Sequence, residues 1–152
     1  MLKKIKIHQG VNLNIDGEAE KIIVDLPRSR TYAVKPDDFF TIVPKLLVKE
    51  GDKVKNGTPL FFSKKNPRIN FVSPVSGIVT SIVRGPKRKI LEIIVTDDKK
   101  NDSVFFETAS HEKLTLDEIK ELILKSGFWP FIKQRPYDII SSPEDTPKSI
   151  FI

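Results

Sequence analysis

The chain has 152 residues, of which 39% are hydrophobic and 30% charged, and its formal net charge is +6. This length is enough for one or two compact units with a buried core, and the composition is that of a globular protein rather than a fibrous or disordered one. The absence of cysteine excludes disulfides, thiolate-bound iron–sulfur clusters and cysteine zinc sites within this chain, and no apolar run approaches the roughly 18 residues of a membrane-spanning helix.

Residues 1–45 are predicted to form strands that pack on the domain that follows. Short apolar or alternating runs indicate strands at three places, namely Ile5–Ile7, Val11–Ile15 and Lys21–Asp25. Residues 27–40 contain two prolines and two adjacent aspartates, which disfavour a helix. This segment is therefore predicted to be an irregular connection into a strand.

Residues 46–96 show a regular series of short apolar runs separated by turn residues. The predicted strands include Leu46–Val48, Pro59–Phe62, Ile78–Val83 and Ile90–Val95, and Ile69, Phe71 and Val75 are expected to point inward. The turns are Glu50-Gly51-Asp52, Asn56-Gly57, the hairpin tip Lys64-Lys65-Asn66-Pro67, Ser76-Gly77 and the basic turn from Arg84 to Lys89. This pattern predicts a mainly β fold, a barrel-sandwich hybrid like that of biotinyl and lipoyl carrier domains.

Residues 97–140 are predicted to add a strand, one supporting helix and an aromatic segment. A polar loop is followed by a candidate strand at Val104–Glu107. Thr115 and Glu118 have the spacing of a capping box, and Gly127 suits the left-handed position after a helix. The predicted buried stripe of this helix consists of Leu116, Ile119, Leu122 and Ile123. Residues 141–152 are predicted to be an extended linker and the start of a further domain.

Six motifs follow one another along the chain, namely Val48 to Lys55, Lys64 to Pro67, Ser73 to Gly77, Arg84 to Arg88, Ser126 to Trp129 with Arg135-Pro136, and Thr146 to Phe151. In this order they resemble the N-terminal region of the NqrA family, the A subunits of bacterial sodium-translocating NADH:quinone oxidoreductases. Each motif alone has low specificity, but the turn-rich hybrid pattern followed by a helix, Ser-Gly-Phe-Trp and Arg-Pro is specific. The likeness extends over nearly the whole chain.

The resemblance implies a subunit that lies peripherally on the cytoplasmic face of the bacterial inner membrane. The complex of this family oxidises NADH, reduces ubiquinone or a related quinone such as menaquinone, and exports sodium. The resemblance further implies that this region binds no cofactor of its own, is not catalytic alone, and acts mainly in docking to the other subunits, with a candidate part in quinone access.

Basic residues concentrate in residues 51–100, where eleven lysines and arginines face four aspartates and glutamates. The candidate residues for binding an anionic partner or phospholipid are Lys64, Lys65, Arg84, Lys87 and Arg88. An ordinary solvated surface is the competing interpretation. Aromatic side chains are not interleaved with these residues as a base-stacking platform requires, so no nucleic acid partner is predicted.

An aromatic cluster follows the predicted helix and offers a second candidate site. Its rings could line a site for a planar apolar ligand such as a quinone, with a side-chain amide and a guanidinium as hydrogen-bond donors. The competing interpretation, which we favour, is that the cluster caps the hybrid domain or docks it on another region. The candidate quinone-lining residues are Phe128, Trp129, Phe131, Gln134 and Arg135.

Two other function classes remain open from the sequence. One is a carrier domain with a modified Lys64 or Lys65, although the hairpin tip lacks the flanking residues of lipoyl and biotinyl domains. The other is a related electron-transport subunit, which would need cysteine quartets beyond this chain. His8 and His111 lack partners at metal-ligand spacing, so no metal site and no catalytic residue are predicted.

Overall fold

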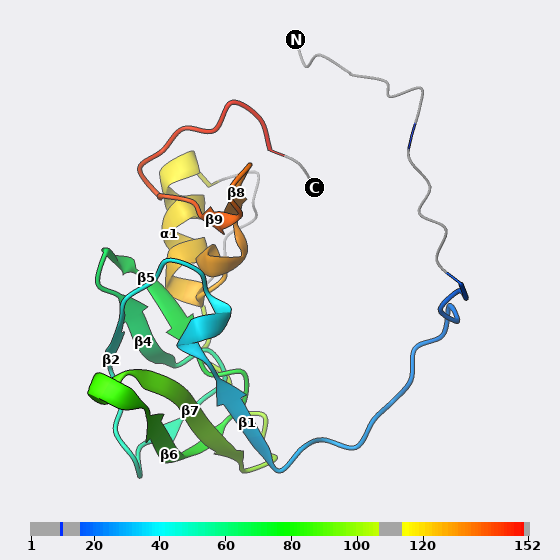
Figure 1. Cartoon of the computed structure of the whole chain (residues 1–152), viewed down its shortest axis with the longest axis vertical. Helices are drawn as coiled ribbons and strands as arrows, with labels where there is room; N and C mark the ends of the chain where they lie inside the picture. Colours follow the sequence, from blue (N-terminus) through cyan, green and yellow to red (C-terminus); the bar gives the residue numbers. More distant parts are fainter. Residues whose placement is uncertain (1–9, 11–15, 107–113, 151–152) are drawn as a thin grey trace.

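The computed structural model of the chain describes residues 10, 16–106 and 114–150 (Figure 1). Strands predominate, and one α-helix follows them, so the prediction of a mainly β fold with a supporting helix is confirmed. In chain order the elements are β1 (Thr31–Val34), η1 (Pro36–Asp38), β2 (Pro44–Leu46), β3 (Lys53–Val54), β4 (Pro59–Ser63), β5 (Asn66–Val72), β6 (Gly77–Arg84), η2 (Pro86–Arg88), β7 (Ile90–Asp97), α1 (Leu116–Ser126), η4 (Trp129–Phe131), β8 (Lys133–Gln134) and β9 (Ile139–Ile140).

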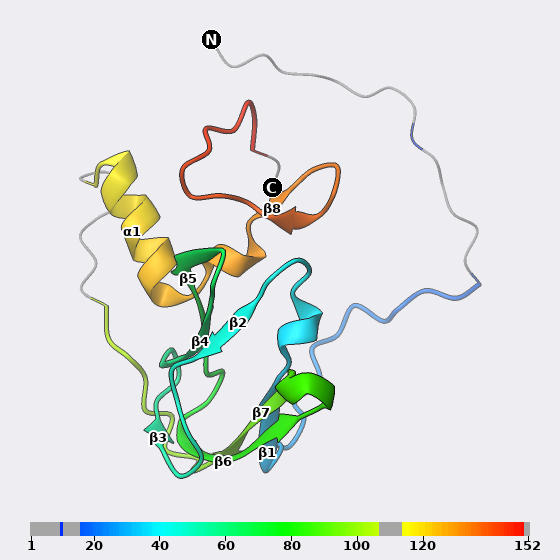
Figure 2. The same ribbon diagram turned by 60° about the vertical axis from the view of Figure 1, so that its left-hand side comes forward.

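The strands form two main sheets whose inner faces share one core. The four-stranded sheet has the order β1-β7-β6-β3, and the three-stranded sheet has the order β2-β4-β5. All of these pairings are antiparallel. Figure 2 shows the two sheets below α1 and the small β8–β9 hairpin.

Aromatic stacking fills the space between the sheets. The ring of Phe61 in β4 stacks on Phe71 in β5 with centroids 4.6 Å apart, and Phe39 meets Phe71 edge-on at 4.5 Å. Val79 and Ile93 close the core from the other sheet and are fully buried. Alternate residues of a strand point to the same face, and Ile69, Phe71 and Val75 are buried as predicted.

Gly77 begins β6 where this strand approaches β7 most closely. A Cβ atom at this position would lie 1.9 Å from the carbonyl oxygen of Thr96. Such a contact is impossible, so the Ser76-Gly77 turn requires glycine because of a backbone approach as well as its positive φ of 156°.

The ends of α1 agree with the sequence prediction. The Thr115 hydroxyl accepts a hydrogen bond from the Glu118 N–H, and the Glu118 carboxylate accepts one from the Thr115 N–H. Gly127 closes the helix in the left-handed conformation at a φ of 76°. These two caps confirm the predicted capping box and C-terminal glycine.

The buried face of α1 differs from the predicted stripe. Leu116 is exposed, whereas Leu124, which the predicted stripe omitted, is buried. Ile123 is half-buried and packs against the core. The helix contacts β5 and η4. Its first turn lines a separate open pocket, where Asp117 and Glu118 lie with Phe105 and Phe106.

Two strand predictions are wrong and two cannot be compared. Residues 21–25 are exposed and form no strand, because this arm runs away from both sheets and meets no strand of the described chain (Figure 1). Residues 104–106 also form no strand, and the nearest pairing is a single bridge between Asn56 and Ser103. The strands predicted at Ile5–Ile7 and Val11–Ile15 lie outside the described residues, as does Glu107.

Residues 31–46 contribute a strand to each sheet. Strand β1 pairs with β7 along Thr31–Val34, and β2 pairs with β4 along Pro44–Leu46. The predicted strand at Leu46–Val48 therefore begins earlier and ends at Leu46. The division at residues 45, 96 and 140 stays a prediction.

We expect Gly127→Ala to destabilise the protein more than Gly51→Ala does. Both glycines have positive φ, 76° and 91°, but a Cβ at 127 would lie 2.4 Å from Val72 Cγ1 while nothing lies within 4 Å at 51. Gly51→Ala should cost about 1 kcal/mol of unfolding free energy, and Gly127→Ala about 2–4 kcal/mol because overpacking adds to backbone strain. Urea denaturation of both variants measures this difference, and equal losses would contradict the close contact.

Candidate functional site

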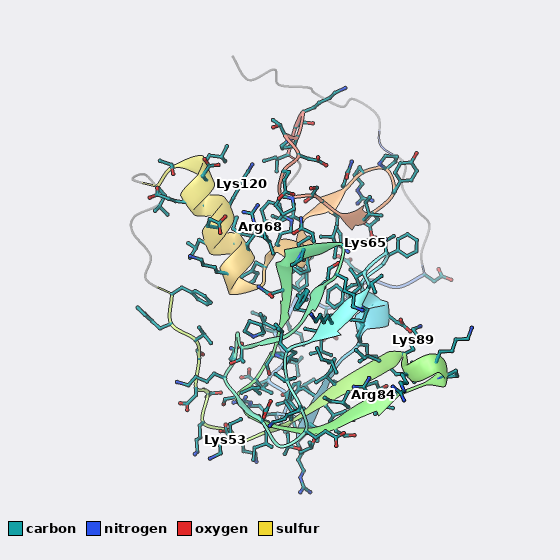
Figure 3. All side chains as sticks on the ribbon, turned by 90° about the vertical axis from the view of Figure 1, so that its left-hand side faces the viewer. Lys53, Lys65, Arg68, Arg84, Lys89 and Lys120 are labelled. Atoms are coloured by element: carbon teal, nitrogen blue, oxygen red, sulfur yellow. The ribbon has the colours of Figure 1, made fainter. Side chains whose placement is uncertain are left out.

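The tip of the β4–β5 hairpin presents two lysines to solvent. Lys64 and Lys65 occupy the turn and are exposed. The Lys64 N–H donates to the Val43 carbonyl at 2.8 Å, and the Arg68 N–H donates to the Asn66 side-chain oxygen at 3.1 Å. These bonds fix the turn, and Lys65 stands at its end in Figure 3.

The β6–β7 turn presents a second set of basic side chains. Arg84, Lys87 and Arg88 are exposed, and the Gly85 N–H donates to the Lys89 carbonyl at 2.8 Å across the turn. Lys89 itself pairs with Asp37, with 2.7 Å between its Nζ and the carboxylate oxygen. The predicted basic turn therefore exists, with one of its cations neutralised.

A shallow groove lies along the segment from Pro36 to Pro44, beside the second turn. It has a volume of about 190 Å³ and is lined by Phe39, Phe40 and Ile42, with Lys89 at its border. The same segment accepts hydrogen bonds from both turns: the Val43 carbonyl accepts one from the first turn, and the Asp37 carboxylate accepts one from Lys89 of the second. Figure 3 shows both turns on one face, with Lys65 above Arg84 and Lys89.

The aromatic segment divides into exposed and buried rings. Phe128 and Phe131 are 66% and 68% exposed, and their ring centroids lie 6.4 Å apart. Trp129 is only 6% exposed, and its indole N–H donates to the Ser141 carbonyl at 2.9 Å. The tryptophan therefore packs in the core, whereas the rings of Phe128 and Phe131 face outward.

The two polar candidates of this segment lie on the β8–β9 hairpin. Gln134 pairs with Ile139 through the backbone, and its side chain is exposed. Arg135 is exposed, and its guanidinium lies 4.0 Å from the Asp138 carboxylate. A quinone-lining role for Phe128, Trp129, Phe131, Gln134 and Arg135 stays a prediction.

Arg68 joins three parts of the chain, a role that the sequence analysis did not find. From β5 its guanidinium pairs with Glu121 of α1 and with Glu144 of the C-terminal segment, the latter at 2.9 Å. The Asn66 side-chain amide donates to the same Glu144 carboxylate at 3.2 Å. Desolvation by itself would lower the pKa of Arg68. The hydrogen bonds from its guanidinium to Glu144 and Glu121 outweigh this effect, so the pKa is raised above its ordinary value.

A buried carboxylate anchors the start of the β1 strand, and the sequence analysis missed this contact as well. The Asp97 side chain at the end of β7 is inaccessible, and Arg28 Nη2 lies 3.0 Å from one of its oxygens. Its other oxygen accepts a hydrogen bond from the Lys99 N–H at 2.8 Å. The pair attaches the segment before β1 to the sheet and gives the buried charge a partner.

Residues 10, 16–106 and 114–150 contain no group of three histidine, cysteine, aspartate or glutamate side chains arranged to hold a metal ion. Over the same ranges no helix has the length and apolar character needed to cross a membrane.

The paired sheets with their connecting hairpins define the class of the N-terminal part, and comparison with known families agrees. A family model described as the NqrA N-terminal barrel-sandwich hybrid domain matches residues 5–98. This match confirms the predicted barrel-sandwich hybrid. A second model, described as the NqrA second alpha/beta domain, matches residues 114–152.

The chain belongs to the NqrA family, as its sequence motifs predicted. It is 35% identical over 151 residues to a protein of Tolumonas auensis that is named as the A subunit of Na(+)-translocating NADH-quinone reductase, and 37% identical to the protein of that name from Neisseria meningitidis. Each alignment covers 97% of this chain and 34% of the relative. The chain thus spans about a third of the length of these relatives.

Acidification should weaken the contact between β5 and the C-terminal segment. The hydrogen bond from Ser142, partly opposed by desolvation and assisted by Arg68, lowers the pKa of Glu144 from its ordinary value of 4.5. A pKa that is lower in the folded state adds stability above the unfolded-state value and loses it as pH falls through the folded value. We therefore expect Glu144→Gln to reduce the loss of stability between neutral pH and pH below 4.5.

Urea denaturation at a series of pH values measures this effect, and Glu20→Gln in the exposed arm is the matched control. The difference in unfolding free energy between the unmodified protein and Glu144→Gln should be largest at neutral pH and shrink in acid. A difference that is constant over this range would contradict the assigned role of Glu144.

Proposed function

We propose that this chain acts as part of the NqrA subunit of a sodium-translocating NADH:quinone oxidoreductase, on the cytoplasmic face of the bacterial inner membrane. Family membership and the names of the relatives support this proposal. The complex would couple NADH oxidation and quinone reduction to sodium export. Within it, the region would bind no cofactor of its own and would act mainly as a docking module for the other subunits.

The observation that carries the docking role is the exposed apolar surface around η4 and the β8–β9 hairpin. Phe128 and Phe131 protrude next to each other, and Ile132 and Tyr137 are also exposed. Soluble monomers rarely expose several large apolar side chains together, and surfaces of this kind often bind another molecule. Aromatic residues of this kind are also frequent among the residues that dominate binding energy.

The support beneath these rings suits a docking role. Trp129 lies between the two phenylalanines in the sequence. Its ring is buried and its indole N–H donates to the Ser141 carbonyl, which holds η4 against the core. The Phe128 N–H donates to the Ile123 carbonyl at 3.2 Å, which ties the start of η4 to the end of α1. A surface whose backbone is already ordered loses less conformational entropy when a partner binds.

A quinone is the second candidate for the same rings, in keeping with the word quinone in the names of the relatives. Two exposed rings 6.4 Å apart can contact a planar apolar ligand, and the exposed side chains of Gln134 and Arg135 can donate hydrogen bonds. Because these polar groups belong to a different turn from the rings, we favour a protein partner.

We expect the double variant Phe128→Ser, Phe131→Ser of the full-length protein to bind the other subunits at least roughly tenfold more weakly, because it removes two exposed aromatic anchors. Phe105→Ser, at a phenylalanine that is 85% exposed elsewhere, is the matched control. Co-purification from detergent-solubilised membranes measures the loss, and thermal unfolding checks that each variant is folded.

The outcomes separate the two candidates. An unchanged complex with a raised KM for quinone in the double variant would favour the quinone site. An unchanged complex with unchanged kinetics would contradict both roles for Phe128 and Phe131.

A further inference from the structure

We propose that the two basic turns and the loop between them form a site that binds an anionic phospholipid surface. The site consists of Lys64 and Lys65 from the β4–β5 turn, Arg84, Lys87 and Arg88 from the β6–β7 turn, and Phe40 and Val43 from the intervening loop. It goes beyond the docking role of the aromatic rings and does not depend on that role.

The five cations of this site are available to an external anion. In the part of the chain that the structure describes, none of them forms an ion pair with a carboxylate, whereas the neighbouring Lys89 pairs with Asp37. Two acids adjoin the site without forming an ion pair among the described residues. Asp38 is exposed on the segment between the turns, and the Glu50 carboxylate accepts a hydrogen bond from the Ile82 N–H at 2.7 Å, two residues from Arg84. The site thus carries a clear excess of positive charge, which a negatively charged membrane surface attracts.

The backbone of the second turn supports a functional reason for its basic side chains. Lys87 and Arg88 both adopt the left-handed conformation, with φ values of 54° and 60°. Glycine or asparagine adopts this conformation at lower cost than lysine or arginine. A positive φ also occurs at the single residue Lys99, whereas the second turn has it at two consecutive basic residues, whose side chains the proposal assigns to anion binding.

The apolar part of the site suits a lipid better than an acidic protein. Phe40 is 66% exposed and Val43 is also exposed, and they lie on the loop that bonds both turns. Phenylalanine is among the apolar side chains that peripheral segments bury at the boundary between lipid headgroups and acyl chains, where long basic side chains can reach the phosphates. An acidic protein surface would pair with the cations but would not by its charge bury the apolar side chains of this loop.

The site can be tested by sedimenting the full-length protein with vesicles. Vesicles of equal parts phosphatidylglycerol and phosphatidylcholine should bind it, and vesicles of pure phosphatidylcholine should not. Raising the salt concentration from about 0.1 M to about 1 M should release most of the protein, because the screening length falls from about 10 Å to about 3 Å.

The variant Lys87→Gly, Arg88→Gly is the sharpest probe because it removes two charges while easing the backbone. It should remain folded and lower the partition onto the anionic vesicles roughly thirtyfold. Lys99→Gly, Lys100→Gly is the matched control, since it also removes two charges and one residue of positive φ, 61° at Lys99. These lysines follow the far end of β7, about 25 Å away at about 3.3 Å per residue.

Phe40→Ser should lower the partition onto anionic vesicles as well, which separates insertion of an apolar side chain from charge attraction alone. Absence of binding to anionic vesicles would overturn the proposal. Equal losses in the two glycine variants would also overturn it, because the attraction would then be a general effect of net charge. Detachment of the Lys87→Gly, Arg88→Gly variant from its partner subunits, with vesicle binding unchanged, would instead assign the turns to an acidic protein surface.

Discussion

Strand β5 holds the described chain together, since it contributes one face to the hybrid core and the rest of its surface to the C-terminal part. Phe71 stacks between Phe61 and Phe39 inside the core. On the other side Val72 meets Gly127 so closely that no side chain fits there, and Arg68 binds acids from α1 and from the C-terminal segment. The position of every exposed surface on α1 and η4 therefore depends on this strand.

The two candidate surfaces come from different parts of the fold. The basic turns are the ends of hairpins of the hybrid domain, which the antiparallel pairing of β4 with β5 and of β6 with β7 places in solvent. The exposed phenylalanines belong to the segment after α1, where the buried Trp129 and Leu124 attach it to β5. A scaffold known for carrying a modified lysine thus presents exposed turns and rings, and function has to be argued from these sites rather than from the fold.

Local features of the sequence predicted much of the fold. The turns, the β4–β5 hairpin tip and both ends of α1 were predictable because glycine, asparagine and capping residues act on the backbone within a few positions. The contact of Arg68 with Glu144 was not predictable, because it joins residues 76 positions apart and leaves no periodic signal. The error at residues 21–25 has a similar cause: the residues favour a strand, but a strand needs a partner.

The candidate sites likewise divide into features that local sequence predicts and features that depend on the assembled core. Exposure of Lys64, Lys65, Arg84, Lys87 and Arg88 could be predicted from charge and turn composition. The opposite environments of Trp129 and its neighbours could not, since adjacent aromatic residues look alike until the core is assembled.

Membership of a respiratory complex, as opposed to a carrier function, is tested most directly on the native protein isolated from its source cells. Its bound partners and the masses of its lysine-containing peptides would be determined together. As part of an NqrA subunit, the protein should co-purify with the membrane-embedded subunits of an NADH:quinone oxidoreductase and carry unmodified Lys64 and Lys65. A protein free of those subunits, with a lipoyl- or biotin-sized addition on either lysine, would contradict this function.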